Sequence, residues 1–512
     1  MVYAQLAFFT ALLGVVPFFV LRHPRLGLGL GLLAFGVEWG LFYANSVSTV
    51  YPLFGFPGFC TAATWLIAAI LCIRLARRQG QKSGSPWLLL PVLYVASLIG
   101  TVILGSHLFN AGAYAALIGS IEQREWTQDI QPKDPKHMRM VSSENALYMA
   151  RKAVANAGAI GSQFGLDWDR LTLQKVKDHL VYVIPFDFAG FSQWQSSVGS
   201  PGFIIVDAED PERAPRLVEL PANGRMHYTP GAYFGHDLER HLREQGYLND
   251  GLEEPRFELD DDERPHWVVP VYRLSLWWGG EKLTGVATVD PASGAIDWYT
   301  LGQAPAWIDR VFPGNLIENY IDERGEYSGG WWNSFWGKLS LTSAEKPILV
   351  YGSDNRPQWV TGVTSTSEKD DSLVGLMYTD SHTGKTIYYR TNGGATDTAI
   401  VQAVDANQQV KFKHLHASTP QIYNVSGVMT SVVPLLNDNH AYQGMALVRV
   451  TNPQDVAVGT TQIEALRAYE AMAFRKGQQI EVGTEHERSL ASSGFDDFDF
   501  KLARTQHAEA GS

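Results

Sequence analysis

Glu38 is the residue whose type and surroundings most suggest chemistry. It is the one acidic side chain among the first 109 residues, and it lies inside an apolar run. An ionised carboxylate in a bilayer is costly unless it is paired or protonated, and such residues mark ion or proton pathways. His107, near the end of a later apolar run, is a candidate partner. Together they predict a transporter or channel subunit, whereas the neighbouring Trp39 favours a carboxylate that only reaches the membrane interface.

Two further clusters suggest metal binding. His414 and His416 lie in a strand-like run, VKFKHLHA, where both imidazoles would share one face. The four consecutive acids at 260–263 would attract Ca²⁺. The histidines have no third ligand nearby in sequence, and the acidic run lacks the glycine and distal glutamate of an EF-hand loop. We therefore expect the two histidines to lie on a solvated strand face and the four acids to form a polar connection. No metal site is expected.

Catalytic and cofactor motifs are absent from the sequence. It contains no P-loop, dinucleotide fingerprint, zinc-type cysteine pair, His-Glu-x-x-His or Gly-x-Ser-x-Gly. No residue is therefore assigned as catalytic, and no cofactor is expected. This favours a protein that is not an enzyme, although an envelope enzyme with a dispersed active site stays an alternative.

Aromatic residues are concentrated in GGWWNSFWG, residues 329–337. If this stretch is helical, Trp332 and Trp336 share a face. Three interpretations follow: packing at a junction between two modules, a subunit interface in a homo-oligomer, or insertion into the outer leaflet of a membrane. We favour the junction, because interior packing is the commonest fate of such residues. The candidate packing or interface aromatics are Trp277, Trp278, Trp331, Trp332, Phe335 and Trp336.

The elements that carry Glu38 and His107 are four apolar runs, residues 3–21, 26–44, 54–73 and 87–109. Each approaches the roughly 20 residues that cross a bilayer as a helix. Basic residues follow the first and third runs, and the loop between the second and third carries no charge. By the positive-inside rule, the N-terminus and everything after about residue 110 are extracytoplasmic. The basic residues are Arg22, Arg25, Arg74, Arg77, Arg78 and Lys82.

The remainder of the chain is acidic. The sequence has 41 basic and 53 acidic residues, of which six and one lie in the first 109; the rest carries a net charge of −17. Such a region repels nucleic acid, so no nucleic-acid partner is expected.

The two cysteines, Cys60 and Cys72, share one apolar run and cannot bridge within one helix.

An internal repeat is the clearest pattern outside the apolar runs. Residues 264–299 and 356–389 both begin Arg-Pro-x-Trp-Val and continue with Gly, Asp, Gly and Tyr at the same spacings of five, four and five. Strand-like runs flank an Asp-x-x-Ser/Thr-Gly turn, which predicts an antiparallel meander in which Asp290 and Asp380 are turn residues. Weaker copies occur in 181–207 and 444–459.

These repeats resemble the PepSY-type module of bacterial extracytoplasmic proteins, a small α+β unit with the pattern W-V…G-x-x-x-V-D-x-x-T-G-x-I. The whole chain is similar to bacterial multipass membrane proteins with a large extracytoplasmic region, a resemblance that implies no particular activity. It implies a bacterial cytoplasmic membrane as the location, with the lipid bilayer and other envelope proteins as partners.

The predicted fold is an α-helical transmembrane anchor of about four helices, followed by a large α+β extracytoplasmic region of antiparallel-sheet repeats. The predicted function is a membrane-anchored scaffold that binds proteins in assembly or regulation at the cell envelope. The predicted segments are an anchor (1–110), a first α+β segment (111–255), a PepSY-like repeat with the aromatic connection (256–345), a second repeat with a C-terminal α+β segment (346–480) and a disordered polar tail (481–512).

Overall fold

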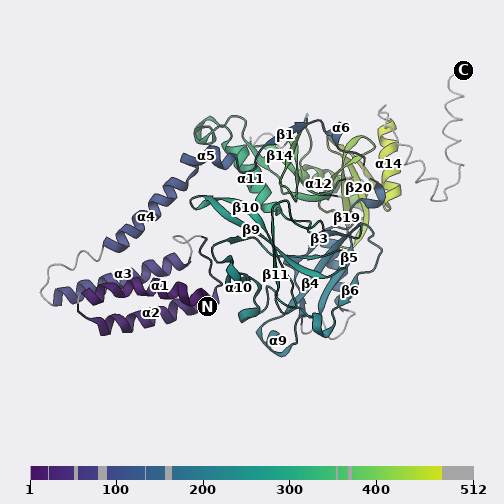
Figure 1. The fold of residues 1–512 in the computed structure, drawn as a ribbon. Coiled ribbons are helices and arrows are strands. Elements are labelled where there is room, and N and C mark those ends of the chain that lie inside the picture. Colours follow the sequence, from purple (N-terminus) through teal and green to yellow (C-terminus); the bar gives the residue numbers. More distant parts are fainter. Residues whose placement is uncertain are drawn as a thin grey trace, which may run out of the picture.

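The computed structural model describes residues 2–20, 22–50, 56–78, 89–132, 134–155, 164–352, 356–366, 372–391 and 393–475. These residues form a helical anchor joined to a sheet-rich body (Figure 1). The predicted polar tail lies outside the described residues. The anchor contains α1 (Val2–Val20), α2 (Pro24–Ala44), α3 (Phe56–Arg78), α4 (Leu89–Gly105) and α5 (His107–Ala115).

The anchor helices are apolar, but fewer qualify as membrane spans than the sequence predicts. Within the described residues, two helices are long and apolar enough to cross a membrane, Pro24–Ala44 and Gly58–Arg78. A third qualifies if Val92–Gly105 and α5, which meet at a bend of 44°, count as one span. A shorter apolar stretch covers Val2–Leu12. Apolar helices before a sheet-rich region are therefore confirmed, whereas four membrane spans are not shown.

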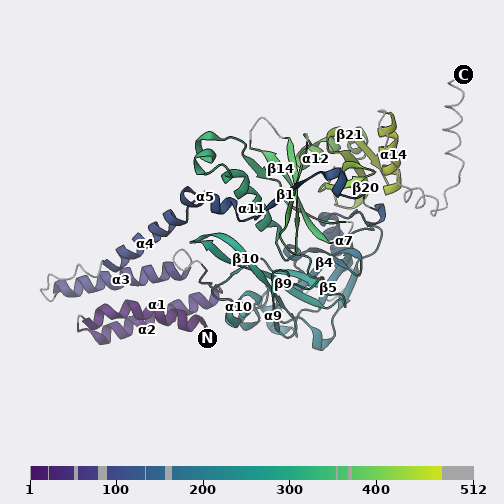
Figure 2. The ribbon, with the colours of Figure 1, turned by 45° about the horizontal axis from the view of Figure 1, so that its top comes forward.

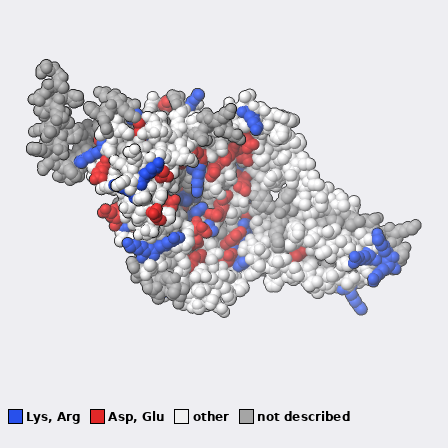
Figure 3. All heavy atoms as spheres, turned by 180° about the vertical axis from the view of Figure 1, so that it is seen from behind, with Lys and Arg blue, Asp and Glu red and all other residues white. Residues whose placement is uncertain are grey.

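The body lies at one end of the anchor, and basic side chains lie at the other. Figures 1 and 2 both place the sheets beyond the N-terminal end of α1. Figure 3 shows Lys and Arg gathered at the end of the anchor farthest from the body. The described arginines near the α1–α2 connection and the end of α3 are Arg22, Arg25, Arg74, Arg77 and Arg78.

Four sheets with one strand order make up the body. The first contains β2 (Phe164–Leu166), β3 (Thr172–Val176), β4 (His179–Phe188), β5 (Gly202–Asp207) and β6 (Arg216–Glu219). The second contains β7 (Gly251–Leu252), β8 (Arg256–Leu259), β9 (Pro265–Leu276), β10 (Gly279–Val289) and β11 (Ile296–Thr300). The third contains β12 (Thr342–Ala344), β13 (Ile348–Tyr351), β14 (Pro357–Ser365), β15 (Leu373–Asp380) and β16 (Thr386–Arg390). The fourth contains β17 (His416–Ala417), β18 (Gln421–Val425), β19 (Val428–Leu436), β20 (Tyr442–Arg449) and β21 (Asn452–Gly459).

In every sheet, one long strand pairs with the two short strands that precede it and then continues into an antiparallel meander. These long strands are β4, β9, β14 and β19. The third sheet gains a sixth strand, because β1 (Ile121–Arg124), which follows α5, pairs in parallel with β16. A segment next to the anchor is thereby built into a sheet whose other strands lie more than two hundred residues further along the chain.

The two clearest sequence copies form equivalent meanders. Val286 pairs with Tyr299 in the second sheet, and Leu376 pairs with Tyr389 in the third. The predicted turns are present in both: Asp290 Oδ1 accepts the amides of Ala292 and Ser293, and Asp380 Oδ1 accepts those of His382 and Thr383. The glycines that close these turns, Gly294 and Gly384, have φ of +74° and +71°, a conformation that favours glycine.

Helices precede or follow each sheet and cover part of it. Contacts between elements place α7 on β5, α11 on β12 and β14, α12 on β20 and β21, and α14 on β21. The Leu238 and Leu242 side chains of α10 share a core with Phe257 and Trp267 of the second sheet. The helices of the body are α6 (Trp126–Asp129), α7 (Ser143–Ala155), α9 (Phe191–Ser196), α10 (Leu238–Leu242), α11 (Gly314–Tyr327), α12 (Asp397–Ala406), α13 (Gln408–Phe412) and α14 (Gln462–Arg475), with π-helical turns at Arg243–Tyr247 and Asn333–Gly337.

The sheets pack on one another as well as on helices. Along β4, Val181 and Val183 enter a core shared with the second sheet, while Tyr182 and Ile184 enter a core shared with the second and third sheets. Alternate residues of a strand point to opposite faces. Both faces of β4 are therefore buried, which explains why Leu180–Phe186, within its sequence HLVYVIPFDF, is continuously apolar.

Candidate functional site

Glu38 joins three anchor helices. Its side chain is 3% exposed; Oε2 accepts a hydrogen bond from Thr10 of α1, and Oε1 accepts one from Thr64 of α3 at 2.6 Å. Both carboxylate oxygens thus have hydroxyl donors, as a buried polar group requires. An apolar groove of about 390 Å³ between α1, α2 and α3 runs beside it. These two hydrogen bonds make Glu38 a polar link between α2 and its neighbours α1 and α3.

The proposed Glu38–His107 pair does not form. Helix α4 diverges from the α1–α3 bundle and carries His107, at the start of α5, toward the body (Figure 1). There, His107 Nε2 lies 3.0 Å from both carboxylate oxygens of Glu323 on α11. Its ring also stacks on Tyr327, with centroids 4.4 Å apart. His107 therefore attaches α5 to the body and does not pair with the carboxylate of Glu38.

The aromatic cluster after α11 is exposed, so the expectation that it packs a junction is wrong. Trp332, Phe335 and Trp336 are 63%, 56% and 68% exposed. Trp332 stacks on Trp336 at 4.9 Å, and Trp331 stacks on Phe335 at 5.3 Å. The rings pair with one another because their i, i+4 spacing places them side by side on a helical turn. Within the part of the chain that the structure describes, no core of another module covers the three exposed rings.

These rings lie on the side of the body from which α4 leaves. Figures 1 and 2 show the turn after α11 beside α5. At the tip of the β9–β10 hairpin, Trp278 donates from Nε1 to the carbonyl of Val102 on α4 at 3.3 Å. Its neighbour Trp277 is 61% exposed. The two tryptophan-rich segments therefore flank the point where α4 meets the body.

A second set of contacts attaches the body to the anchor at the end of α2. Arg240 of α10 donates from Nε to the Tyr43 carbonyl at 3.0 Å, and its guanidinium lies 4.5 Å from the Tyr43 ring centroid. Ser46 donates to Asp237 at 3.2 Å. The Thr49 amide donates to the Leu248 carbonyl at 2.9 Å. The body is thus held at two places, α10 and α5.

The remaining sequence candidates have structural roles. Residues 408–412 are helical and β17 contains only His416–Ala417, so the strand-like interpretation of VKFKHLHA is wrong. Asp260 Oδ1 accepts the backbone amides of Asp262 and Arg264, which makes the acidic run a turn. Among the described residues, no group of three or more His, Cys, Asp or Glu side chains is placed to hold a metal ion.

A central cleft of about 510 Å³ is the feature of the body that the sequence did not indicate. It is lined by Arg139, which precedes α7, by Arg256 at the start of β8, and by Arg310, which precedes α11. Thr419, before β18, also lines it, so segments associated with all four sheets contribute. Figure 3 shows acidic and basic side chains gathered in the hollowed middle of one face of the body.

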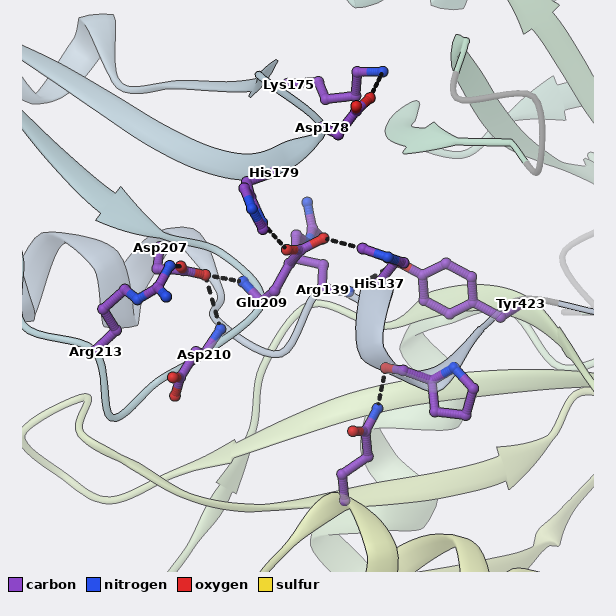
Figure 4. Close-up of polar contacts among 12 residues, drawn as sticks. His137, Arg139, Lys175, Asp178, His179, Asp207, Glu209, Asp210, Arg213 and Tyr423 are labelled. Carbon is purple, nitrogen blue, oxygen red and sulfur yellow. Dashed lines mark hydrogen bonds and ion pairs between the residues drawn. The ribbon is translucent and has the colours of Figure 1, made fainter. Parts of the chain in front are cut away.

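The backbone of Arg139 is held on both sides. The Arg139 backbone amide donates to the Tyr423 hydroxyl at 3.3 Å. The Arg139 carbonyl accepts from the side-chain amide of Gln421 at 3.4 Å. Two residues earlier, His137 contacts Glu209, which also contacts His179, at 3.1 and 3.3 Å (Figure 4). The segment that positions Arg139 is therefore fixed between the first and fourth sheets.

Two carboxyl groups are buried near the arginines. Glu258 is fully buried; its Oε2 accepts the Asp309 amide at 2.9 Å, and its Oε1 has no hydrogen-bond partner among the described residues. Asp309 Oδ2 accepts from the Tyr351 hydroxyl at 2.6 Å and from the Lys175 amide at 2.7 Å. Burial raises the pKa of Glu258 to about 8 and that of Asp309 to about 6, because the charged form loses hydration.

Sequence reasoning missed this cleft because its charged residues are far apart in the chain. Arg139, Arg256 and Arg310 each occur in a different segment and belong to no motif. A signal was present, however, in the strand-like run RFEL, where Glu258 occupies a position flanked by apolar residues. A charged residue at a core position indicates a buried polar network or a site.

Comparison with known proteins does not identify the chain. No protein-family model matches it, and a search of curated proteins finds no match. Among solved structures, it is similar to an ACO/RPE65 chimera at 9% sequence identity, over 55% of this chain and 47% of that chain, with a TM-score of 0.15. The chain thus spans about half the length of that structure, and at this TM-score the likeness supports no argument about fold or function.

The buried state of Glu258 generates a pH prediction. In the folded protein, Glu258 keeps its proton up to about pH 8. In the unfolded chain, a glutamate loses its proton at about pH 4.3. Between these values the folded state binds more protons, so stability falls as the pH rises. Glu258→Gln removes this contribution, and we expect the melting temperature of the purified protein to decrease less between about pH 5 and pH 8 than in the wild type.

The exposed residue Glu239 provides the matched control, because its side chain is 53% exposed. Glu239→Gln is expected to retain the wild-type pH dependence. A Glu258→Gln variant with an unchanged pH dependence would show that Glu258 is already ionised in the folded protein.

Proposed function

We propose that the protein is a membrane-anchored extracytoplasmic scaffold that binds other proteins at the cell envelope. The observation that carries this proposal is the attachment of a large body to its anchor through both α10 and α5. Two separate attachments restrict how the body can tilt, so its surfaces keep a constant direction relative to the bilayer. A scaffold for assembly or regulation needs this property, whereas a freely tethered domain lacks it.

The proposed topology has four spans, formed by α1, α2, α3 and the bent pair α4–α5. Basic side chains at the far end of the anchor support a cytoplasmic position for that end. The N-terminus and the body would then share the extracytoplasmic side. The uniform strand order of the four sheets supports the proposal that the body consists of PepSY-like repeats, of which residues 264–299 and 356–389 retain the clearest sequence similarity.

The exposed rings after α11 support contact with the outer leaflet. Tryptophan prefers the membrane–water interface because its ring is apolar and its indole N–H can bond to water or headgroups. Exposed apolar residues of α5, Leu108 and Phe109, lie near the same end of α4 and are 44% and 63% exposed. Together with Trp332 and Trp336, they would support the body on the bilayer where α4 enters it.

A second aromatic cluster supports a protein partner. Phe191 of α9 lies 5.2 Å from Tyr233 and 6.1 Å from Phe234, ring centroid to centroid. These three side chains are 44%, 37% and 53% exposed. Clustered aromatics are characteristic of protein-binding hot spots. Helix α9 is drawn on the opposite side of the second sheet from α5 (Figure 1), which leaves this cluster away from the α4 exit.

The topology is tested by single cysteines in a Cys60→Ala, Cys72→Ala background. We expect Asp438→Cys, whose native side chain is 79% exposed on the body, to react with an impermeant maleimide in intact cells. Pro24→Cys, between Arg22 and Arg25, should react only after permeabilisation. The reverse pattern would place the body in the cytoplasm and contradict the proposal.

Leaflet contact is tested by attaching the fluorophore bimane to Trp336→Cys in the same background. In liposomes that contain acyl-chain-brominated lipids, we expect blue-shifted and quenched emission, because a probe at the interface is within reach of the bromine atoms. Bimane at Asp438→Cys should remain unquenched. Emission from position 336 that is water-like, and changes on dilution of the protein, would instead indicate a subunit interface.

Protein binding is tested by replacing Phe191 with a photo-crosslinking phenylalanine derivative in cells. We expect illumination to link the protein to a discrete second polypeptide, and Phe234→Ser to reduce that product by about tenfold or more, as for a hot-spot residue. The control position is Phe412, which is 86% exposed but has no aromatic ring partners among the described residues. Equal yields from positions 191 and 412 would contradict a partner site at this cluster.

A further inference from the structure

The central cleft has more cationic than anionic side chains in its lining. Its lining contains four basic side chains, Arg139, Arg256, Arg310 and Lys346, and two acidic ones, Glu254 and Glu318. The full chain, by contrast, has a net charge of −12. A basic cleft in an acidic protein is a local reversal of charge, which attracts anions into the cleft and away from the remaining surface.

Two of these arginines have unused hydrogen-bonding capacity. Arg139 is 8% exposed, and its Nε is buried without a hydrogen-bond partner; the Nε of Arg310 is in the same state. Within the described ranges, neither side chain forms an ion pair. An unpaired buried donor is costly, and a guanidinium presents its donors as a planar fork that matches a carboxylate or phosphate. Both side chains line the cleft, so an oxyanion that enters it meets two guanidinium groups without an ion-pair partner among the described residues.

The neighbouring charges do not neutralise the arginines. Burial and the proximity of Arg310 lower the pKa of Arg256, which indicates that the cations crowd one another. The acid behind them, Glu258, has a pKa raised by burial to about 8 and is therefore largely uncharged at neutral pH. Glu254 pairs with Arg256 at 3.1 Å but is 66% exposed at the rim. Asp309, with a pKa of about 6, keeps a negative charge next to Arg310, but its carboxylate already accepts from Tyr351 and the Lys175 amide. The lining itself, with four basic and two acidic side chains, is net positive.

The rest of the lining combines apolar side chains with the polar residues Ser143, Tyr182, Asn315 and Thr419. Trp359 is 6% exposed, and Leu173 and Leu349 are 3% and 4% exposed. The Arg310 guanidinium lies 5.4 Å from the Trp359 ring centroid, which holds its fork in place by a cation–π contact. A volume of about 510 Å³ falls within the range of small-molecule sites. A second polar cavity, near Arg124 and Lys385, differs because both of these cations are already paired with Glu122.

We propose that the central cleft binds a small organic anion, with its carboxylate or phosphate group on Arg139 and Arg310 and its apolar body against Trp359. The segments that supply these contacts belong to different sheets, so the ligand would bridge them. The proposal goes beyond the scaffold function and does not depend on membrane topology or on a protein partner. Both can fail without affecting it.

The test measures binding of benzoate and phenyl phosphate to the full chain in lipid nanodiscs by saturation-transfer NMR, with empty nanodiscs subtracted. Benzyl alcohol serves as the neutral probe. We expect at least one anion to bind about tenfold more tightly than benzyl alcohol, because hydrogen bonds to charged groups are stronger than neutral ones. Preference for benzoate identifies a carboxylate ligand, and preference for phenyl phosphate identifies a phosphate ester.

Variants locate the site. Arg139→Met and Arg310→Met should each weaken anion binding by about tenfold or more, while Arg310→Lys keeps the charge and should lose less. Arg216→Met is the matched control, because Arg216 is 55% exposed and paired with Glu263 outside the cleft. A melting temperature measured without ligand confirms that each variant is folded. Equal binding of anions and benzyl alcohol by the wild type, or unchanged anion binding in folded Arg310→Met and Arg310→Lys, would overturn the proposal.

Discussion

The body depends on one constraint: a sheet with two apolar faces must bury both, and where helices leave a face uncovered another sheet covers it. The first sheet shows this most directly, because β4 presents Val183 to one core and Ile184 to another. The third and fourth sheets share a further core, to which Val360 and Val448 belong. Because the sheets cover one another, their loops and strand ends converge on common boundaries. The central cleft is such a boundary, and its arginines come from the segments that meet there.

The same constraint explains how charged residues came to be buried. Arg310 and Asp309 are adjacent in the connection from β11 to α11, which must cross from the second sheet to the third. Asp309 is 3% exposed and bonds to Tyr351 of β13 and to the backbone of β3. The carboxylate therefore links the first and third sheets, and the Asp309 amide, which donates to Glu258 of β8, links both to the second. Its neighbour Arg310 is carried to the cleft by the same peptide, so the structural acid and the cleft cation are positioned together.

Sequence reasoning recovered the features that depend on neighbouring residues. The turn chemistry of Asp290 and Asp380 and the apolar helices of the anchor follow from local patterns. It failed where distant segments meet. The partner of His107 is Glu323, more than two hundred residues away, and the exposure of Trp332 depends on which surfaces the sheets leave uncovered. All four sheets have the same strand order, but only the second and third contain clear copies of the sequence repeat. The first and fourth sheets keep the strand order with little of the repeated sequence motif.

The parallel pairing of β1 with β16 has a practical meaning for dividing the chain. Because Ile121–Arg124 completes the third sheet from a position directly after the anchor, the body has no clean cut between its membrane part and its first sheet. A fragment that starts after Arg124 would leave the edge of β16 unpaired, and an unpaired edge recruits strands from other molecules. During synthesis, more than 250 further residues must be added after β1 before its partner strand β16 has been made. The membrane-proximal segment is thus both the first part of the body to be made and among the last to be fixed in place.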